Sequence, residues 1–159
     1  MAITLRPPRD DDLDWVVRRH GALYTGEYGW NEEFEVLVAG IVEQFRQNFD
    51  PAWEGCWIAE VDGERVGSVF MVHKSDTVAK LRLLFVEQAA RGQGVGRALV
   101  EECIRFARER GYRQIVLWTN SCLLPARHIY EKTGFRMIEA EPHHSFGVDL
   151  VGETWILDL

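Results

Sequence analysis

The feature that most constrains the fold of this chain is a strand that leads through a glycine-rich loop into a helix. Residues 78–86 alternate in polarity as a strand does, and residues 99–107 place apolar side chains on one helical face. Glycine has no Cβ, so backbone N–H groups can approach a ligand closely, and a helix N-terminus favours an anion. The segment therefore predicts an anion-binding loop, whose glycines and arginines are Arg91, Gly92, Gly94, Gly96 and Arg97.

The spacing of these glycines excludes two common phosphate-binding loops. The loop of NTPases requires G-x-x-x-x-G-K-[ST], but Arg97 directly follows Gly96. The dinucleotide fingerprint G-x-G-x-x-G fails as well, because the position three residues after Gly94 is Arg97. The pattern R/Q-x-x-G-x-G/A does match, with Arg91, Gly94 and Gly96 at its defined positions.

A second motif lies downstream, where residues 126–135 read A-R-H-I-Y-E-K-T-G-F. This segment resembles the A-x-x-x-Y-E-K-x-G-F signature of the GNAT superfamily of N-acetyltransferases, and the glycine-rich loop resembles the acyl-CoA loop of that family. One helix and one strand fit between the two motifs, as in the family. Residues 141–155 resemble most closely the GNAT domain of fused MarR–GNAT proteins.

The hydrophobic periodicity predicts an α+β domain with a mixed, mostly antiparallel sheet flanked by helices, which is the GNAT-like architecture. The order is β-α-α-β-β-β-α-β-α-β-β, and residues 1–159 are expected to form a single acyl-CoA N-acyltransferase domain. Strands are expected at 3–6, 56–61, 65–72, 78–86, 115–118, 135–138 and 154–157, and helices near 12–23, 34–45, 95–110 and 126–133.

The resemblance implies acetyl-CoA as a co-substrate, with no metal, and it assigns the residues that would bind it. Backbone groups at the end of the strand would pair with the pantetheine arm, and loop amides with two arginines would hold the pyrophosphate. These cofactor-binding residues are Leu84, Phe85, Val86, Arg91, Gly92, Gln93, Gly94, Val95, Gly96 and Arg97.

Two further positions follow from the resemblance. Tyr130 would lie near the sulfur as the catalytic proton donor. Many family members carry an asparagine that helps to hold the cofactor at the position of Leu123, and here Asn120 either substitutes for it or is a turn residue.

The implied reaction is transfer of the acetyl group to a primary amine by direct attack in a ternary complex. A non-catalytic acyl-CoA-binding sensor module and a nucleotide-phosphate binder are the alternatives. The general base stays open among Glu27, Glu32, His73 and His144. The acceptor also stays open as a small molecule, a peptide or a protein. The net charge of −7 favours a cationic acceptor through electrostatic steering.

Composition narrows the partners and the compartment. A net charge of −7 is unlike the basic excess of nucleic-acid binders, so no direct nucleic-acid contact is expected. No apolar run approaches the ~18–20 residues that span a bilayer, so no membrane is expected. Three cysteines without a CxxC pair, behind a polar N-terminus, favour a cytoplasmic protein. A homodimer stays open.

Overall fold

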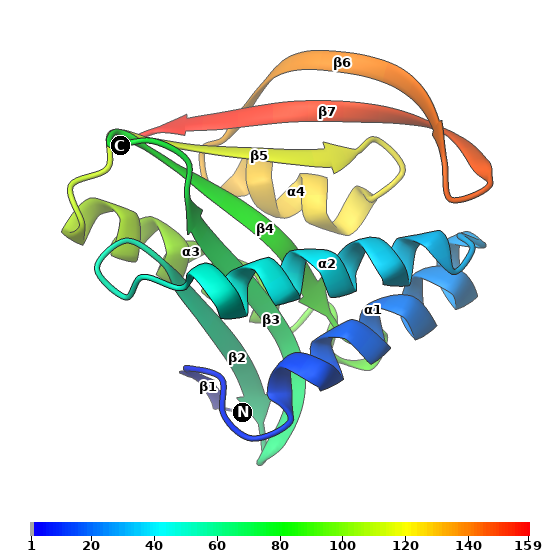
Figure 1. The fold of residues 1–159 in the computed structure, drawn as a ribbon, viewed down its shortest axis with the longest axis horizontal. Helices are drawn as coiled ribbons and strands as arrows, with labels where there is room; N and C mark the ends of the chain where they lie inside the picture. The colour runs from blue at the N-terminus through cyan, green and yellow to red at the C-terminus, as the bar shows by residue number, and fades with distance from the viewer. Residues whose placement is uncertain (1) are drawn as a thin grey trace.

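The computed structural model describes residues 2–159, and Met1, which the domain expectation includes, lies outside them. A seven-stranded mixed sheet in the order β1-β2-β3-β4-β5-β7-β6 forms the centre (Figure 1). The predicted class and order of elements are confirmed, with one added 3₁₀ turn. The elements are β1 (Ile3–Arg6), α1 (Asp12–Tyr28), α2 (Glu33–Asn48), β2 (Gly55–Val61), β3 (Glu64–His73), β4 (Val78–Val86), η1 (Gln88–Ala90), α3 (Val95–Glu109), β5 (Gln114–Asn120), α4 (Leu124–Lys132), β6 (Arg136–Ser145) and β7 (Val148–Asp158).

Each face of the sheet carries its own hydrophobic core. Val69 and Met71 of β3 pack in the cluster that includes α3 and α4, whereas Phe70 between them packs in the cluster of α1 and α2. This division follows from the two-residue side-chain period of a strand. In Figure 1, α1 and α2 cross in front of β3 and β4, and α3 lies behind the sheet. Along a regular stretch of strand, such as residues 69–71 of β3, alternate residues therefore meet different helices.

Three elements are longer than the sequence pattern predicts. The first helix was expected to end near residue 23, but α1 continues to Tyr28 and ends at Gly29, which has a left-handed φ of 71°. A glycine inside a helix costs only about 1 kcal/mol relative to alanine, which tertiary packing outweighs. The last two strands were expected to be short, but β6 and β7 pair over most of their length around a turn at Phe146 and Gly147.

The sheet opens between β4 and β5. These parallel strands pair only at residues 78–80 with 114–116, and beyond that point they diverge, as Figure 1 shows. The register of β4 against β3 also shifts, with Leu83 at a φ of 55° and neither Leu83 nor Leu84 paired with a neighbouring strand. A bulge of this kind bends a strand and redirects its backbone groups. Beyond Lys80, the edge of β4 that faces β5 has no strand partner.

Candidate active site

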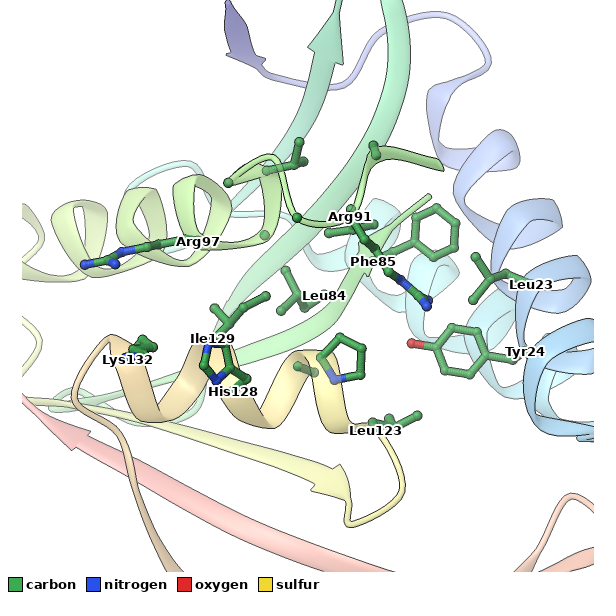
Figure 2. Close-up of a pocket in the computed structure, with 18 of the residues that line it drawn as sticks. Leu23, Tyr24, Leu84, Phe85, Arg91, Arg97, Leu123, His128, Ile129 and Lys132 are labelled. Atoms are coloured by element: carbon green, nitrogen blue, oxygen red, sulfur yellow. The ribbon is translucent and has the colours of Figure 1, made fainter. Parts of the chain in front are cut away.

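A cavity of about 420 Å³ lies beside the unpaired edge of β4 (Figure 2). The glycine-rich loop and the first turn of α3 form one wall, α4 forms another, and α1 contributes aromatic side chains. The lining residues are Leu23, Tyr24, Tyr28, Leu84, Phe85, Val86, Ala90, Arg91, Gly92, Gly94, Val95, Gly96, Arg97, Leu123, Pro125, Ala126, His128, Ile129 and Lys132.

Most of the residues predicted to bind the cofactor line this cavity. The structure brings together the end of β4 with the loop and the start of α3, as the resemblance implied. Gln93 is the loop residue that does not line it. Asn120 and Tyr130 line a second cavity instead. The roles assigned to these three residues stay predictions.

The glycines of the loop serve different purposes. Gly94 caps α3 with a φ of 87°, and its missing Cβ would meet only the tip of Ile3, at 4.0 Å. Gly96 lies inside α3, where a Cβ would come within 2.4 Å of the Ile129 side chain. Gly94 is therefore required by backbone conformation and Gly96 by the close approach of α4. Both keep side chains out of the cavity wall.

The two arginines of the loop differ in their partners. Arg91 binds Glu27 of α1 through two hydrogen bonds, with Nη1–Oε1 at 2.6 Å and Nη2–Oε2 at 2.7 Å. This pairing lowers the pKa of Glu27 and raises that of Arg91. Arg97 forms only a loose, exposed contact with Glu101 at 3.6 Å. In Figure 2, Arg91 extends toward Tyr24, whereas Arg97 extends along α3 away from it.

A second cavity of about 500 Å³ adjoins the first, and Tyr24, Leu84, Leu123 and Ala126 line both. It lies between α1 and α2 on one side and the diverging strands β4 and β5 on the other. Its remaining lining residues are His20, Trp30, Phe34, Leu37, Ile41, Lys74, Lys80, Leu81, Arg82, Leu83, Val116, Leu117, Trp118, Thr119, Asn120, Tyr130, Phe146 and Thr154. The two cavities therefore meet along four shared residues, of which Leu84 lies on the unpaired edge of β4.

Two tyrosines stand near this junction. Tyr130 is only 4% exposed, and within residues 2–159 its hydroxyl forms no hydrogen bond. Burial raises the pKa of Tyr130 and that of Tyr24 well above the ordinary value for tyrosine. Both phenols are therefore protonated at neutral pH, and each hydroxyl can donate a hydrogen bond. The hydroxyl of Tyr24 points into the first cavity in Figure 2.

Sequence reasoning missed Tyr24. Its signal is a stripe of ring side chains on one face of α1, because His20, Tyr24 and Tyr28 are spaced four residues apart. The rings of His20 and Tyr24 stack at 5.9 Å, and those of Tyr24 and Tyr28 lie 5.4 Å apart. No known motif marks this stripe. Its position beside the cavity follows only from the packing of α1 against β4.

Asn120 is held at the end of β5 by a histidine of β6. Its Oδ1 lies 2.8 Å from Nε2 of His143, whose Nδ1 lies 2.9 Å from the Ser145 hydroxyl. Asn120 is buried and lines the second cavity. Its amide is thus oriented by the β6–β7 hairpin, a segment that the sequence pattern assigned mostly to a loop.

None of the four residues considered as a general base lines either cavity. The Nδ1 atom of His73 lies 2.9 Å from the Tyr112 hydroxyl, and that of His144 lies 2.8 Å from Asp149. Glu27 is engaged by Arg91, and Glu32 is exposed before α2. The titratable groups that line the second cavity are His20, Tyr24, Lys74, Lys80, Arg82 and Tyr130.

The described residues offer neither a cluster of metal-binding side chains nor a membrane-spanning helix. Over residues 2–159, no group of three or more His, Cys, Asp or Glu side chains is arranged to hold a metal ion. No helix in the same range combines the length and the apolar character needed to cross a membrane.

The structure thus combines an open mixed sheet, a glycine-rich loop before α3 and two adjoining cavities. A sequence model described as the acetyltransferase (GNAT) family matches residues 10–135. The chain therefore belongs to the acetyltransferase (GNAT) family. The expectation of an acetyl-CoA-dependent N-acetyltransferase is confirmed at the level of the family.

Individual relatives agree with this assignment. An uncharacterized N-acetyltransferase of Archaeoglobus fulgidus is 29% identical over 86% of this chain and 95% of its own length. Human N-acetyltransferase 8B is 38% identical over 67% of this chain, which spans 50% of that relative. A Salmonella typhimurium structure described with its cofactor acetyl-CoA has a TM-score of 0.78 at 18% identity, covering 100% of this chain and 95% of the other.

Proposed function

We propose that this chain transfers the acetyl group of acetyl-CoA to a primary amine by direct attack in a ternary complex. The observation that supports this most is the meeting of two cavities at Leu84, on the edge of β4 that has no strand partner. A thioester carrier in the first cavity would present its acyl group to an amine in the second. No covalent acyl-enzyme is required, because the two ligands meet directly.

The first cavity would hold acetyl-CoA mainly through backbone groups. Leu84, Phe85 and Val86 would pair with the pantetheine arm as an added strand, since β4 lacks a neighbour there. The amides of residues 92–97 would bind the pyrophosphate at the N-terminus of α3. Arg97 and Arg91 would both attract the phosphates through their positive charge. Arg91 would remain paired with Glu27 as it does so. Asn120 would contact the acetyl end, because it lines the second cavity.

The chemistry then needs one proton removed and one supplied. A free alkyl amine has a pKa of ~10.4, so the acceptor must lose a proton before its nitrogen attacks the carbonyl carbon. A backbone N–H near the end of β4, around Val86, would stabilise the developing oxyanion. As the nitrogen–carbon bond forms, the carbon–sulfur bond breaks, and Tyr130 would protonate the departing thiolate. The lost proton of the amine passes to a base or through water.

The finer expectations about the chain also remain proposals. Residues 1–159 would act as one domain, because a single sheet runs from β1 to β7. Three free cysteines favour the cytoplasm. The resemblance of residues 141–155 to fused MarR–GNAT proteins stays a hypothesis. That the chain makes no direct contact with nucleic acid, and that it forms a homodimer, are hypotheses as well.

Substituting each tyrosine singly tests the proposed proton donor. Tyr130→Phe keeps the ring packed against Phe135 and removes only the hydroxyl, and Tyr24→Phe is the matched control. We expect single-turnover acetyl transfer to fall by roughly 10²-fold in Tyr130→Phe, with little change in acetyl-CoA affinity, because donation strengthens only as the carbon–sulfur bond breaks.

The competing outcomes of this test are distinct. Loss of rate in Tyr24→Phe alone would assign the proton to Tyr24. An unchanged rate in both folded variants would leave water as the donor. Binding of acetyl-CoA by the wild type without transfer to any amine in a broad panel would favour the sensor alternative over an enzyme.

A further inference from the structure

Three cationic side chains line the second cavity, and no acidic side chain does. They are Lys74, which follows β3, and Lys80 and Arg82 of β4. Within residues 2–159, none of the three side chains forms an ion pair or a hydrogen bond. The wall of this cavity therefore carries positive charge that the protein does not neutralise.

The strand period aims two of these cations at the same space. Lys80 and Arg82 are two residues apart on β4 and pair with Val72 and Phe70 of β3, on the face that α1 and α2 cover. Leu81, between them, belongs to the opposite core. Burial lowers the pKa of Lys80, and the charges of Arg82 and Lys74 lower it further. A bound anion would offset the cost of burying the Lys80 ammonium and its repulsion by Arg82 and Lys74.

Other partly buried arginines of this chain are paired. Arg6 contacts Asp12 at 2.6 Å, Arg19 contacts Glu87 at 2.6 Å, and Arg127 contacts Glu153 at 2.8 Å. The chain has 25 acidic residues against 18 basic ones, so acidic partners are abundant. An unpaired cationic group in such a chain is most simply explained by a charge that arrives with the ligand.

Much of the remaining cavity wall is apolar and aromatic. The rings of Trp30, Phe34 and Phe146 contact one another with centroid separations of 4.9 to 5.1 Å. Leu37 on α2, 46% exposed, and Trp118 on β5, 49% exposed, border the same space. Such a surface favours a ligand with an apolar body.

Building on the proposed acetyltransferase function, we propose that the acceptor is an amine that also bears an anionic group, of the carboxylate or phosphonate kind. Lys80 and Arg82 would bind that group, with Lys74 at the rim, while the aromatic cluster of Trp30, Phe34 and Phe146 would hold an apolar side chain. Amino acids with large apolar side chains have this chemistry. The net charge of −7 favoured a cationic acceptor, whereas the positive charge in the second cavity favours an acceptor with an anionic group.

The test compares acceptors that share a body and differ in one group. Phenylalanine, phenylalaninamide and the phosphonate analogue of phenylalanine are assayed with acetyl-CoA, and CoA release gives kcat/KM for each. We expect an anionic acceptor to exceed the amide by roughly 10- to 100-fold, as a charge-assisted hydrogen bond implies. Whichever of the two anionic acceptors gives the higher kcat/KM identifies whether a carboxylate or a phosphonate is preferred.

Two variants locate the effect. In Arg82→Gln, and separately in Lys80→Met, the ratio of kcat/KM for the anion over the amide should fall about 10-fold, mainly through KM. Arg108→Gln removes an exposed arginine of α3 on the opposite face and should retain the wild-type ratio. A wild-type enzyme that prefers the amide, or a ratio unchanged in both folded cavity variants, would overturn the inference and leave the acetyltransferase intact.

A binding measurement separates this inference from the proposed function. N-acetylphenylalanine and its amide are titrated calorimetrically into the wild type and Arg82→Gln in the presence of CoA. The acid should bind the wild type at least 10-fold more tightly than the amide does, and the variant should lose this preference. If no amine is acetylated, the proposed function fails, and equal binding of acid and amide then overturns this inference as well.

Discussion

At the residue scale, His20 shows how burial sets the chemistry of a group in this site. Its Nδ1 donates a hydrogen bond to the Val16 carbonyl at 2.7 Å, so Nε2 carries the lone pair and has no partner in the described chain. Burial lowers the pKa of His20 to about 4, although the bond to Val16 opposes this shift. His20 is therefore neutral at physiological pH. Its ring packs against that of Phe85, with 4.8 Å between the two ring centroids.

This burial predicts a specific loss of stability in acid. The unfolded pKa of histidine is ~6.5, so the unfolded chain binds a proton at His20 that the folded chain rejects until about pH 4. Stability from the neutral ring is complete above ~6.5 and falls as the pH drops toward 4, by about 3 kcal/mol. In His20→Phe, the free energy of unfolding should therefore fall by about 3 kcal/mol less than in the wild type as the pH drops from ~6.5 to about 4.

Urea unfolding at pH 7.5, 5.5 and 4.5 measures this difference. His128→Asn removes an exposed histidine of α4 and should retain the wild-type slope. A His20→Phe protein that folds but keeps the same slope would mean that His20 is not the group that resists protonation.

At the element scale, the loop before α3 combines a conformational and a steric requirement. Gly94 and Gly63 share a left-handed conformation, with φ values of 87° and 79°, and neither would place a Cβ against neighbouring atoms closer than 4.0 Å. Gly63 lies in the β2–β3 turn, where Asp62 also has a positive φ, as the predicted hairpin requires. Only Gly94 lines the first cavity.

These two glycines form a matched pair for testing the loop. Gly94→Glu and Gly63→Glu both place a side chain in a conformation that favours glycine, costing about 1 kcal/mol each. Only Gly94→Glu should also abolish acetyl-CoA binding, because its carboxylate would occupy the proposed pyrophosphate site and repel the phosphates. Calorimetry with acetyl-CoA decides. Equal affinities in the two folded variants would exclude the loop from the binding site.

At the scale of the whole molecule, the first cavity lies across a weak seam of the sheet. β4 and β5 are joined by only three residue pairs, and β5 to β7 with α4 form the far side of the opening. The cavity draws its walls from both sides, since the loop and α3 face α4 across it. A ligand bound there would connect the two parts of the sheet beyond their own pairing.

Acetyl-CoA binding should therefore stabilise the molecule across this seam. At a ligand concentration 100 times the dissociation constant, the free energy of unfolding should rise by about 2.7 kcal/mol. Amide hydrogen exchange should slow in residues 84–97 and also in α4, because both would contact the ligand. Protection confined to one side of the opening would contradict a ligand that bridges it.

Local pattern was sufficient for the elements and for the first cavity. Alternation along 78–86, the glycines of the loop and the 126–135 motif each act within a few residues. They predicted β4 and the start of α3 where the structure has them, and α4 to within two residues of its ends. The nine predicted cofactor residues that line the cavity all belong to one continuous segment, 84–97. The ends of β6 and β7 escaped prediction because their pairing with each other, and not their residue pattern, determines their length.

The sequence by itself thus determined the family, the order of elements and the position of the glycine-rich loop, because each is encoded by neighbours along the chain. Only the tertiary structure decided the second cavity. Its walls come from α1, α2, β4, β5 and the β6–β7 turn, segments that are far apart in sequence. The same is true of charge: Arg91 is paired with Glu27, 64 residues away, whereas Lys80 and Arg82 have no partner among residues 2–159. Net composition cannot reveal which charges are neutralised, because pairing depends on distance in space.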